Sequence, residues 1–203
     1  MSARGDTRVE LVGGLARSQA ARRRRVIDAT LRLAAAGGFD GVQMRDVAAE
    51  ADVAVGTVYR YFTSKERLLL EAMAEQQADL RDHLRARPPT GTTASERVMH
   101  VLRRANRNLQ RHPDVTAAMV RAFGSAETDN ADVVRAVTEI MNEIITGAMH
   151  GDERRVATDG ELRIARILQQ VWLSSLNGWV CGVDPATRVD EDLDAACRLL
   201  LDR

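Results

Sequence analysis

The stretch GFDGVQMRDVAAEADVAVGTVYRYFTSKERLL, residues 38–69, decides the fold of this chain. Apolar residues recur in it at helical spacing, which predicts a short helix over about residues 44–51 and a second over about residues 55–61. Residues 52–54 leave room only for a tight turn between them. Because neither helix is long enough to be stable alone, we expect the pair to pack as a helix-turn-helix on a small shared core.

The second helix of this pair carries an unusual group of side chains. The chain is only 3% aromatic, yet both of its tyrosines and one of its three phenylalanines fall within residues 59–62, beside Arg60 and close to Lys65. Val58 and Phe62 are one turn apart and should point into the core. A lone tyrosine is most often a half-buried aromatic, but a protruding helix with hydroxyl and cationic groups fits the major groove of DNA, about 12 Å wide. The cluster therefore favours a DNA-binding surface.

Residues 38–69 resemble the DNA-binding domain of TetR-family regulators almost throughout. The resemblance implies a transcriptional repressor that binds an inverted-repeat operator as a homodimer. One feature departs from the family pattern, because the first helix of the pair is usually capped by threonine or serine and this chain has Val42 and Gln43 there. The implied base contacts are Arg45, Val55, Gly56, Thr57 and Arg60, and the implied phosphate contacts are Tyr59, Tyr61 and Lys65.

Helix starts and stops can be located along the rest of the chain. A threonine followed three residues later by a glutamate is a capping box, and this pattern predicts helix starts at Thr63, Thr93 and Thr158. Gly37 and Gly38 should end the first helix, and the proline at 113 should separate two later ones.

No segment alternates with period 2 for long enough to indicate a strand, so the predicted fold class is all-α with nine helices. Residues 1–17 are polar, contain glycine and follow no period, which favours a disordered arm. With the TetR resemblance, residues 18–67 form a three-helix DNA-binding domain that contains the helix-turn-helix. Residues 68–203 then form a helical ligand-binding and dimerisation domain.

The charge of the chain is balanced overall but not along its length. Residues 1–67 hold 12 basic against 8 acidic side chains, a net of +4, and residues 68–203 hold 17 against 21, a net of −4. The first third is the part that would meet a polyanion. An effector-independent, nucleoid-type DNA-binding protein remains an alternative, although sequence-independent binding would predict a strongly basic chain.

Composition also indicates where the protein works. No stretch approaches the ~20 apolar residues of a membrane span, and the N-terminus lacks the apolar core of a signal peptide. Cys181 and Cys197 lie among apolar neighbours, which favours buried, reduced thiols. We therefore expect a cytoplasmic protein that does not associate with membranes.

An enzyme is disfavoured as the function class. The sequence shows no phosphate-binding glycine loop, no Gly-x-Ser-x-Gly and no paired-cysteine motif, so neither catalytic residues nor a cofactor are expected. A small all-helical enzyme stays the alternative from this class. The histidines, none at metal-ligand spacing, are His83, His100, His112 and His150.

The helices beyond residue 93 carry the candidate effector site. From residue types alone an ordinary core is the more frequent outcome, because methionine fills both cores and ligand pockets. Residues 106–122 (NRNLQRHPDVTAAMVRA) and 164–179 (IARILQQVWLSSLNGW), however, resemble KstR-type regulators of sterol catabolism from actinobacteria. This resemblance implies a CoA thioester effector; a regulator of drug efflux or of another lipid pathway, with another hydrophobic effector, is the alternative. The expected lining is Met99, Leu102, Arg103, Asn106, Met119, Phe123, Met141, Ile145, Leu168 and Trp172.

The predicted helix over about residues 161–181 is apolar over an arc too wide to face one neighbour. One side should face the protein's own core and the other a second subunit. Ser174, Ser175 and Gly178 are small enough to let another backbone approach. Together with the helix over about residues 190–202 it predicts a four-helix dimer interface, as the TetR resemblance also implies.

Overall fold

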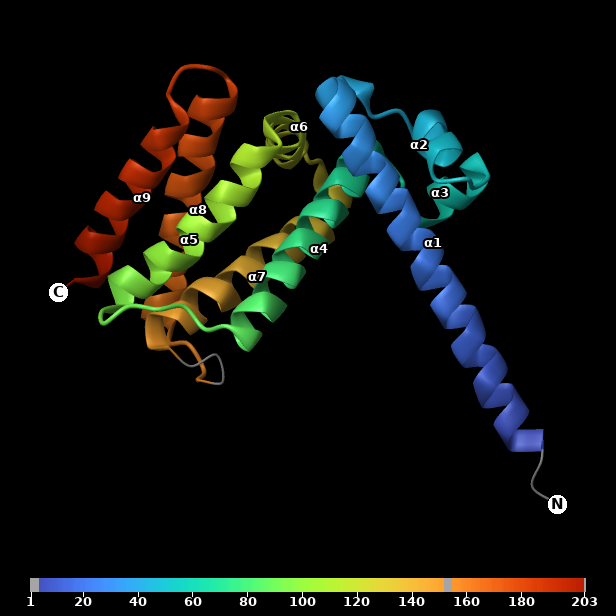
Figure 1. Ribbon diagram of the computed structural model, residues 1–203, viewed down its shortest axis with the longest axis horizontal. Coiled ribbons are helices and arrows are strands. Elements are labelled where there is room, and N and C mark those ends of the chain that lie inside the picture. The colour runs from blue at the N-terminus through green and yellow to red at the C-terminus, as the bar shows by residue number, and fades with distance from the viewer. Residues whose placement is uncertain (1–3, 152–154, 203) are drawn as a thin grey trace.

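The structure is a computed structural model that describes residues 4–151 and 155–202. Over these residues the chain forms nine α-helices, one 3₁₀ turn and no strand, which confirms the all-α fold (Figure 1). The elements are α1 (Arg4–Gly41), α2 (Met44–Glu50), α3 (Val55–Tyr61), α4 (Lys65–Ala86), α5 (Ala94–Arg111), α6 (Pro113–Gly124), η1 (Thr128–Asn130), α7 (Ala131–His150), α8 (Asp159–Val180) and α9 (Ala186–Leu201).

Helix α1 begins earlier than expected. Its backbone is helical from Arg4, whereas the sequence predicted a disordered arm over residues 1–17, of which the first three lie outside the described residues. The segment contains no proline and extends an existing helix, which needs no new nucleus. At its other end the helical dihedrals break at Gly37 and Gly38, as predicted. Gly38 has φ 60° and ψ −155°, a conformation essentially restricted to glycine.

Two of the three predicted capping boxes are confirmed. Thr93 and Thr158 each accept a hydrogen bond from the third residue of the following helix, and the glutamate there bonds back to the capping N–H. The box predicted at Thr63 is wrong. Helix α4 is capped by Ser64, whose hydroxyl accepts from the Arg67 N–H at 3.2 Å. Two neighbouring hydroxyl residues offered the backbone a choice that the local pattern did not resolve.

The glutamate of the last box also joins α8 to the end of α7. The Glu161 carboxylate accepts from the Thr158 backbone N–H at 2.7 Å, and its other oxygen lies 2.6 Å from His150 Nε2. The Thr158 backbone bond, followed by the His150 bond, lowers the pKa of Glu161 to about 2. The group is therefore ionised at neutral pH, where it holds the two helix ends together.

The helices enclose two hydrophobic cores. The N-terminal core joins α1–α4 to α6 and the start of α7, and the C-terminal core joins α5, α7, α8 and α9. Helix α6 is shared, since Ala118 and Met119 belong to the first core and Val120 to the second. The predicted boundary after residue 67 falls inside α4, directly before Leu68, which is fully buried in the N-terminal core. The DNA-binding unit thus shares its core with helices of the following domain.

Two ion pairs reinforce this junction. Arg67 at the start of α4 donates to both carboxylate oxygens of Asp132 on α7, at 2.9 and 2.7 Å. Arg121 of α6 donates to Asp40, beyond the α1 kink, at 3.0 Å. In Figure 1, α2 and α3 lie beside α1 at one end of the molecule, and α8 and α9 form the opposite end. Among the described helices none has the length and apolar character to span a membrane.

The two cysteines differ in environment. Cys197 of α9 is fully buried, as predicted, and this burial raises the pKa of its thiol to about 12. Cys181 is exposed, so the expectation of a buried thiol is wrong there. It directly follows the last residue of α8, where the chain leaves the helix, and the apolar neighbours in its sequence do not cover it.

Candidate DNA-binding surface and effector region

Helix α3 is anchored on one side and open on the other. Val58 and Phe62 are 0% and 1% exposed, which confirms that they point into the core. Tyr59, between them in the sequence, is 52% exposed and Val55 is 37% exposed. The side of α3 that faces away from the core therefore carries large side chains that the protein does not cover.

The turn before α3 fixes how that helix protrudes. Asp52 adopts a left-handed backbone with φ 52°, and its N–H donates to the Ala49 carbonyl at 3.2 Å. The Val53 N–H donates to Ala48 at 3.0 Å, which closes α2. An aspartate tolerates this conformation better than most residues. The turn is therefore tight, as the sequence predicted, and α3 begins directly after it.

Neither the packing nor the backbone conformation of this chain requires a glycine at position 56. A Cβ built on it would meet nothing within 4 Å, and its φ lies in the ordinary helical range. Glycine costs up to about 0.5–1 kcal/mol relative to alanine in a helix interior, and Gly56 is the second residue of α3. Packing within the chain does not explain this cost, so the absence of a side chain points to something outside the chain.

The remaining side chains of α3 form an open aromatic and cationic cluster. The Arg60 guanidinium lies 5.1 Å from the centre of the Tyr61 ring, and its Nη2 is 3.5 Å from the Tyr61 hydroxyl. Arg60 has no ion pair among the described residues. Thr57 and Tyr61 are half-buried. Arg45, on α2, is exposed and also lacks a recorded partner within the described chain.

Lys65 is held in place by the residue that follows the α1 kink. Its ammonium lies 4.1 Å from the centre of the Phe39 ring and 3.4 Å from the Phe39 carbonyl oxygen. Arg121 of α6 lies over the same ring at 4.3 Å. One aromatic ring thus positions a predicted phosphate contact and touches a helix of the following domain.

At the start of α2, Gln43 occupies the capping position without a side-chain capping bond. Its amide instead donates to the Asp40 carbonyl at 2.9 Å. The start of α2 therefore has no side-chain cap, which agrees with the absence of threonine or serine at residues 42 and 43.

The residues predicted to line an effector cavity divide between the two cores and the surface. Met119 and Phe123 pack in the N-terminal core, and Arg103 lies on the surface, where it donates to Asp194 at 3.1 Å. The predicted lining therefore stays a prediction. The residues of it that pack in the C-terminal core are Met99, Leu102, Met141, Ile145, Leu168 and Trp172.

Asn106 is 1% exposed, and both ends of its side-chain amide are hydrogen-bonded within the chain. Its amide oxygen accepts from the Trp172 indole N–H at 2.6 Å, and its amide N–H₂ donates to Asp190 at 2.6 Å. Buried polar groups must find partners, and here two other helices supply them. The side chain that suggested a ligand contact in the sequence joins α5, α8 and α9.

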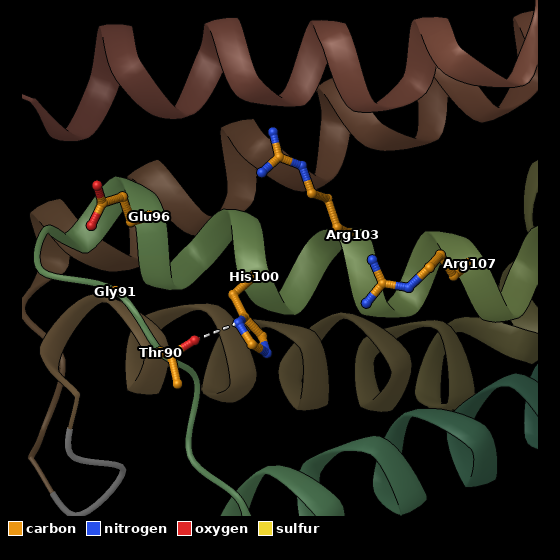
Figure 2. Close-up of a pocket in the computed structure, with 6 residues that line it drawn as sticks. All are labelled: Thr90, Gly91, Glu96, His100, Arg103 and Arg107. Carbon is orange, nitrogen blue, oxygen red and sulfur yellow. Dashed lines mark hydrogen bonds between the residues drawn. The ribbon is translucent and has the colours of Figure 1, made fainter.

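A pocket of about 340 Å³ lies on the outer side of α5 (Figure 2). Of the predicted effector residues it includes only Arg103. The sequence analysis missed the others, although a basic stripe at positions 100, 103 and 107 of one helix was visible in the sequence. The lining residues are Thr90, Gly91, Glu96, His100, Arg103 and Arg107.

Two of the small residues expected at a dimer interface serve the chain itself. The Ser175 hydroxyl donates to Asp192 at 2.7 Å, and a Cβ on Gly178 would lie 2.5 Å from an oxygen of Asp184. A side chain at position 178 would therefore displace the Asp184 carboxylate of the turn between α8 and α9. Apolar side chains nevertheless remain uncovered on these helices, among them Leu162 at 39% and Leu199 at 77% exposure.

Comparisons with known proteins agree with this architecture. The family described as bacterial regulatory proteins, tetR family, matches residues 26–72, and the tetracyclin repressor-like C-terminal domain matches residues 91–200. The first match contains the helix-turn-helix and the second runs from the pocket loop to α9. Across the described residues, no group of three or more histidine, cysteine or acidic side chains could hold a metal ion.

Similar proteins span most of the chain. The HTH-type transcriptional repressor KstR of Rhodococcus jostii is 42% identical over 91% of this chain and 84% of its own length. KstR of Mycobacterium tuberculosis is 39% identical over 91% and 82%. The crystal structure of a TetR transcriptional regulator from Rhodococcus sp. RHA1 is 29% identical, with a TM-score of 0.83 over 91% of this chain and 97% of that one. Thermus thermophilus FadR in complex with lauroyl-CoA shares the fold, with 24% identity and a TM-score of 0.70 over 88% and 92%. The chain therefore belongs to the TetR family of bacterial regulatory proteins.

Proposed function

We propose that this protein is a ligand-responsive transcriptional repressor of lipid or sterol catabolism. A homodimer binds an inverted-repeat operator through α3, and a hydrophobic CoA thioester, sterol-derived or fatty acyl, releases it. The DNA-binding part of this proposal rests on the exposed face of α3. It presents Gly56, Tyr59 and Arg60 outward, and packing within the chain explains neither the bare glycine nor a guanidinium that has no ion pair among the described residues.

A homodimer follows from the geometry of DNA. One subunit offers one recognition helix, and two such helices must reach major grooves about 34–36 Å apart or a multiple of that. The uncovered apolar side chains of α8 and α9, at the opposite end from α3, supply a surface for the second subunit. The zero net charge of the chain argues against a sequence-independent DNA coat, which would gain affinity from a strong positive charge.

Three observations support a CoA thioester as effector. The KstR repressors are about 40% identical to this chain. The FadR structure of the same fold contains lauroyl-CoA. The C-terminal core contains three flexible methionines, Met99, Met141 and Met149, which can adapt to an apolar ligand. A ligand acts only by its differential affinity for two states, and α6, shared by both cores, is placed to transmit the difference.

The test is a titration of the protein–operator complex with fatty acyl-CoA and sterol-derived acyl-CoA compounds. A coupling of 1–3 kcal/mol, typical of allosteric proteins, would weaken operator binding about 5–150-fold. Unchanged operator affinity at saturating concentrations of every thioester would remove the effector assignment and leave the DNA assignment standing. Release by an unrelated hydrophobic drug alone would favour the efflux-type alternative.

A further inference from the structure

Helix α5 concentrates positive charge that the chain neutralises only in part, since Arg103 is paired with Asp194 at 3.1 Å. It carries five arginines against one glutamate, a net of +4, in a chain of zero net charge. Arg97 is used internally, donating to the Ala148 carbonyl at 2.9 Å. Arg107 and Arg111 have no hydrogen bond or ion pair to any other described residue. Unpaired arginines in a row on one helix repel one another, so an external anion would stabilise them.

Part of this charge lines the pocket on α5. His100, Arg103 and Arg107 are spaced three and four residues apart and therefore share one face of the helix. In Figure 2 the Arg107 guanidinium turns back along α5 toward His100. His100 Nδ1 lies 2.9 Å from the Thr90 hydroxyl. A Thr90 hydroxyl that donates to Nδ1 would leave the proton of a neutral ring on Nε2, where a ligand could accept it.

The pocket has an acidic end, which sets where an anion can bind. Glu96 accepts from the backbone N–H of Thr92 at 2.6 Å and of Thr93 at 3.2 Å, and the Thr92 hydroxyl bond is the largest cause that lowers its pKa. Its negative charge is thus committed to capping α5. Arg103 lies seven residues further on, about 10 Å along the helix axis. An anion would bind at the Arg103 and Arg107 end.

We propose that this pocket binds the phosphate groups at the nucleotide end of the CoA thioester effector, an assignment that rests on the proposed function. Arginine forks match phosphate oxygens in geometry and charge. A volume of about 340 Å³ is near the lower end of ligand pockets, ~300–1,000 Å³, so it holds only part of a thioester. The acyl part then belongs in the C-terminal core, into which Met99 and Leu102 of the same helix point.

The experiment measures binding of four probes by calorimetry: coenzyme A, palmitoyl-CoA, S-palmitoyl-pantetheine, which lacks the phosphates and the nucleotide, and inorganic phosphate. The variant is Arg107→Ala and the matched control is Arg111→Ala, another unpaired arginine of α5 outside the pocket. We expect Arg107→Ala to weaken coenzyme A and palmitoyl-CoA about 10- to 100-fold, as for the loss of a charge-assisted hydrogen bond. S-palmitoyl-pantetheine should bind both variants as it binds the wild type.

Equal palmitoyl-CoA affinity in Arg107→Ala and the wild type would overturn the assignment, as would equal affinity of the wild type for the two palmitoyl probes. If inorganic phosphate displaces coenzyme A at matched concentration, the pocket is only a general anion site, and the assignment to the CoA phosphates is also overturned. If palmitoyl-CoA releases the operator while Arg107 proves irrelevant, the proposed function stands and this inference fails. If coenzyme A binds through Arg107 while no thioester releases the operator, the effector assignment fails and the pocket assignment stands.

Discussion

Replacing Gly56 by alanine separates folding from DNA binding more cleanly than any other change on α3. The added methyl group meets no atom within 4 Å in the free protein, and the backbone is already helical. Gly56 is the second residue of α3, so alanine there should raise the free energy of unfolding by at most the helix-interior value of about 0.5–1 kcal/mol. If the bare backbone at this position faces DNA, the same methyl group prevents close approach, and operator affinity should fall by tenfold or more, about 1.4 kcal/mol.

The assay pairs urea denaturation with fluorescence anisotropy on labelled operator DNA. Gly160→Ala is the matched control, because this exposed glycine lies in the first turn of α8 and its Cβ would make only an ordinary contact, 3.9 Å from the Thr158 hydroxyl. The control should be at least as stable as the wild type and bind DNA equally. A Gly56→Ala protein that gains stability and keeps operator affinity within about twofold would refute the reasoning for α3, since an effect of one lost contact is expected to exceed that.

Three further changes test other parts of the structure. Glu161→Gln should lower the free energy of unfolding at pH 7. Because the pKa of Glu161 in the folded protein is depressed from 4.5 to about 2, the difference in stability between variant and wild type should shrink as the pH falls from about 4.5 to 2. A constant difference in urea denaturation over that pH range would contradict the assignment. A thiol reagent at pH 8 should modify only Cys181 in the native protein and Cys197 only after unfolding; two fast thiols per native chain would contradict the burial of α9. Trp172→Phe leaves the buried Asn106 oxygen without a donor and should cost about 1–3 kcal/mol of stability; an unchanged urea midpoint would show that this bond contributes nothing.

Local signals in the sequence predicted the helices well. The capping boxes at Thr93 and Thr158 and the stop at Gly37–Gly38 depend on atoms a few residues apart, so the sequence contains all the information needed. The prediction failed at Thr63, where the adjacent Ser64 caps the helix instead. It also missed the early start of α1, because a helix can extend through a weakly patterned segment once it has formed.

The same distinction between local and long-range information applies to the functional surfaces. The anchoring of α3 by Val58 and Phe62 followed from helical spacing alone. The effector lining did not, since residue type does not distinguish a packed core from a cavity. Asn106 shows the reason: its partner Asp190 is 84 residues away in the sequence, and only the fold brings the two together. Gly178 is a similar case, because the carboxylate that lies against it, Asp184, belongs to the following turn.

The central claim is that a dimer of this protein recognises DNA through two copies of α3. The most direct measurement is a selection of bound sequences from random double-stranded DNA with the purified protein at physiological salt. We predict enrichment of an inverted repeat whose half-sites are centred about 34–36 Å apart or a multiple of that. A single asymmetric half-site bound by a monomer, or no enriched sequence at all, would contradict it.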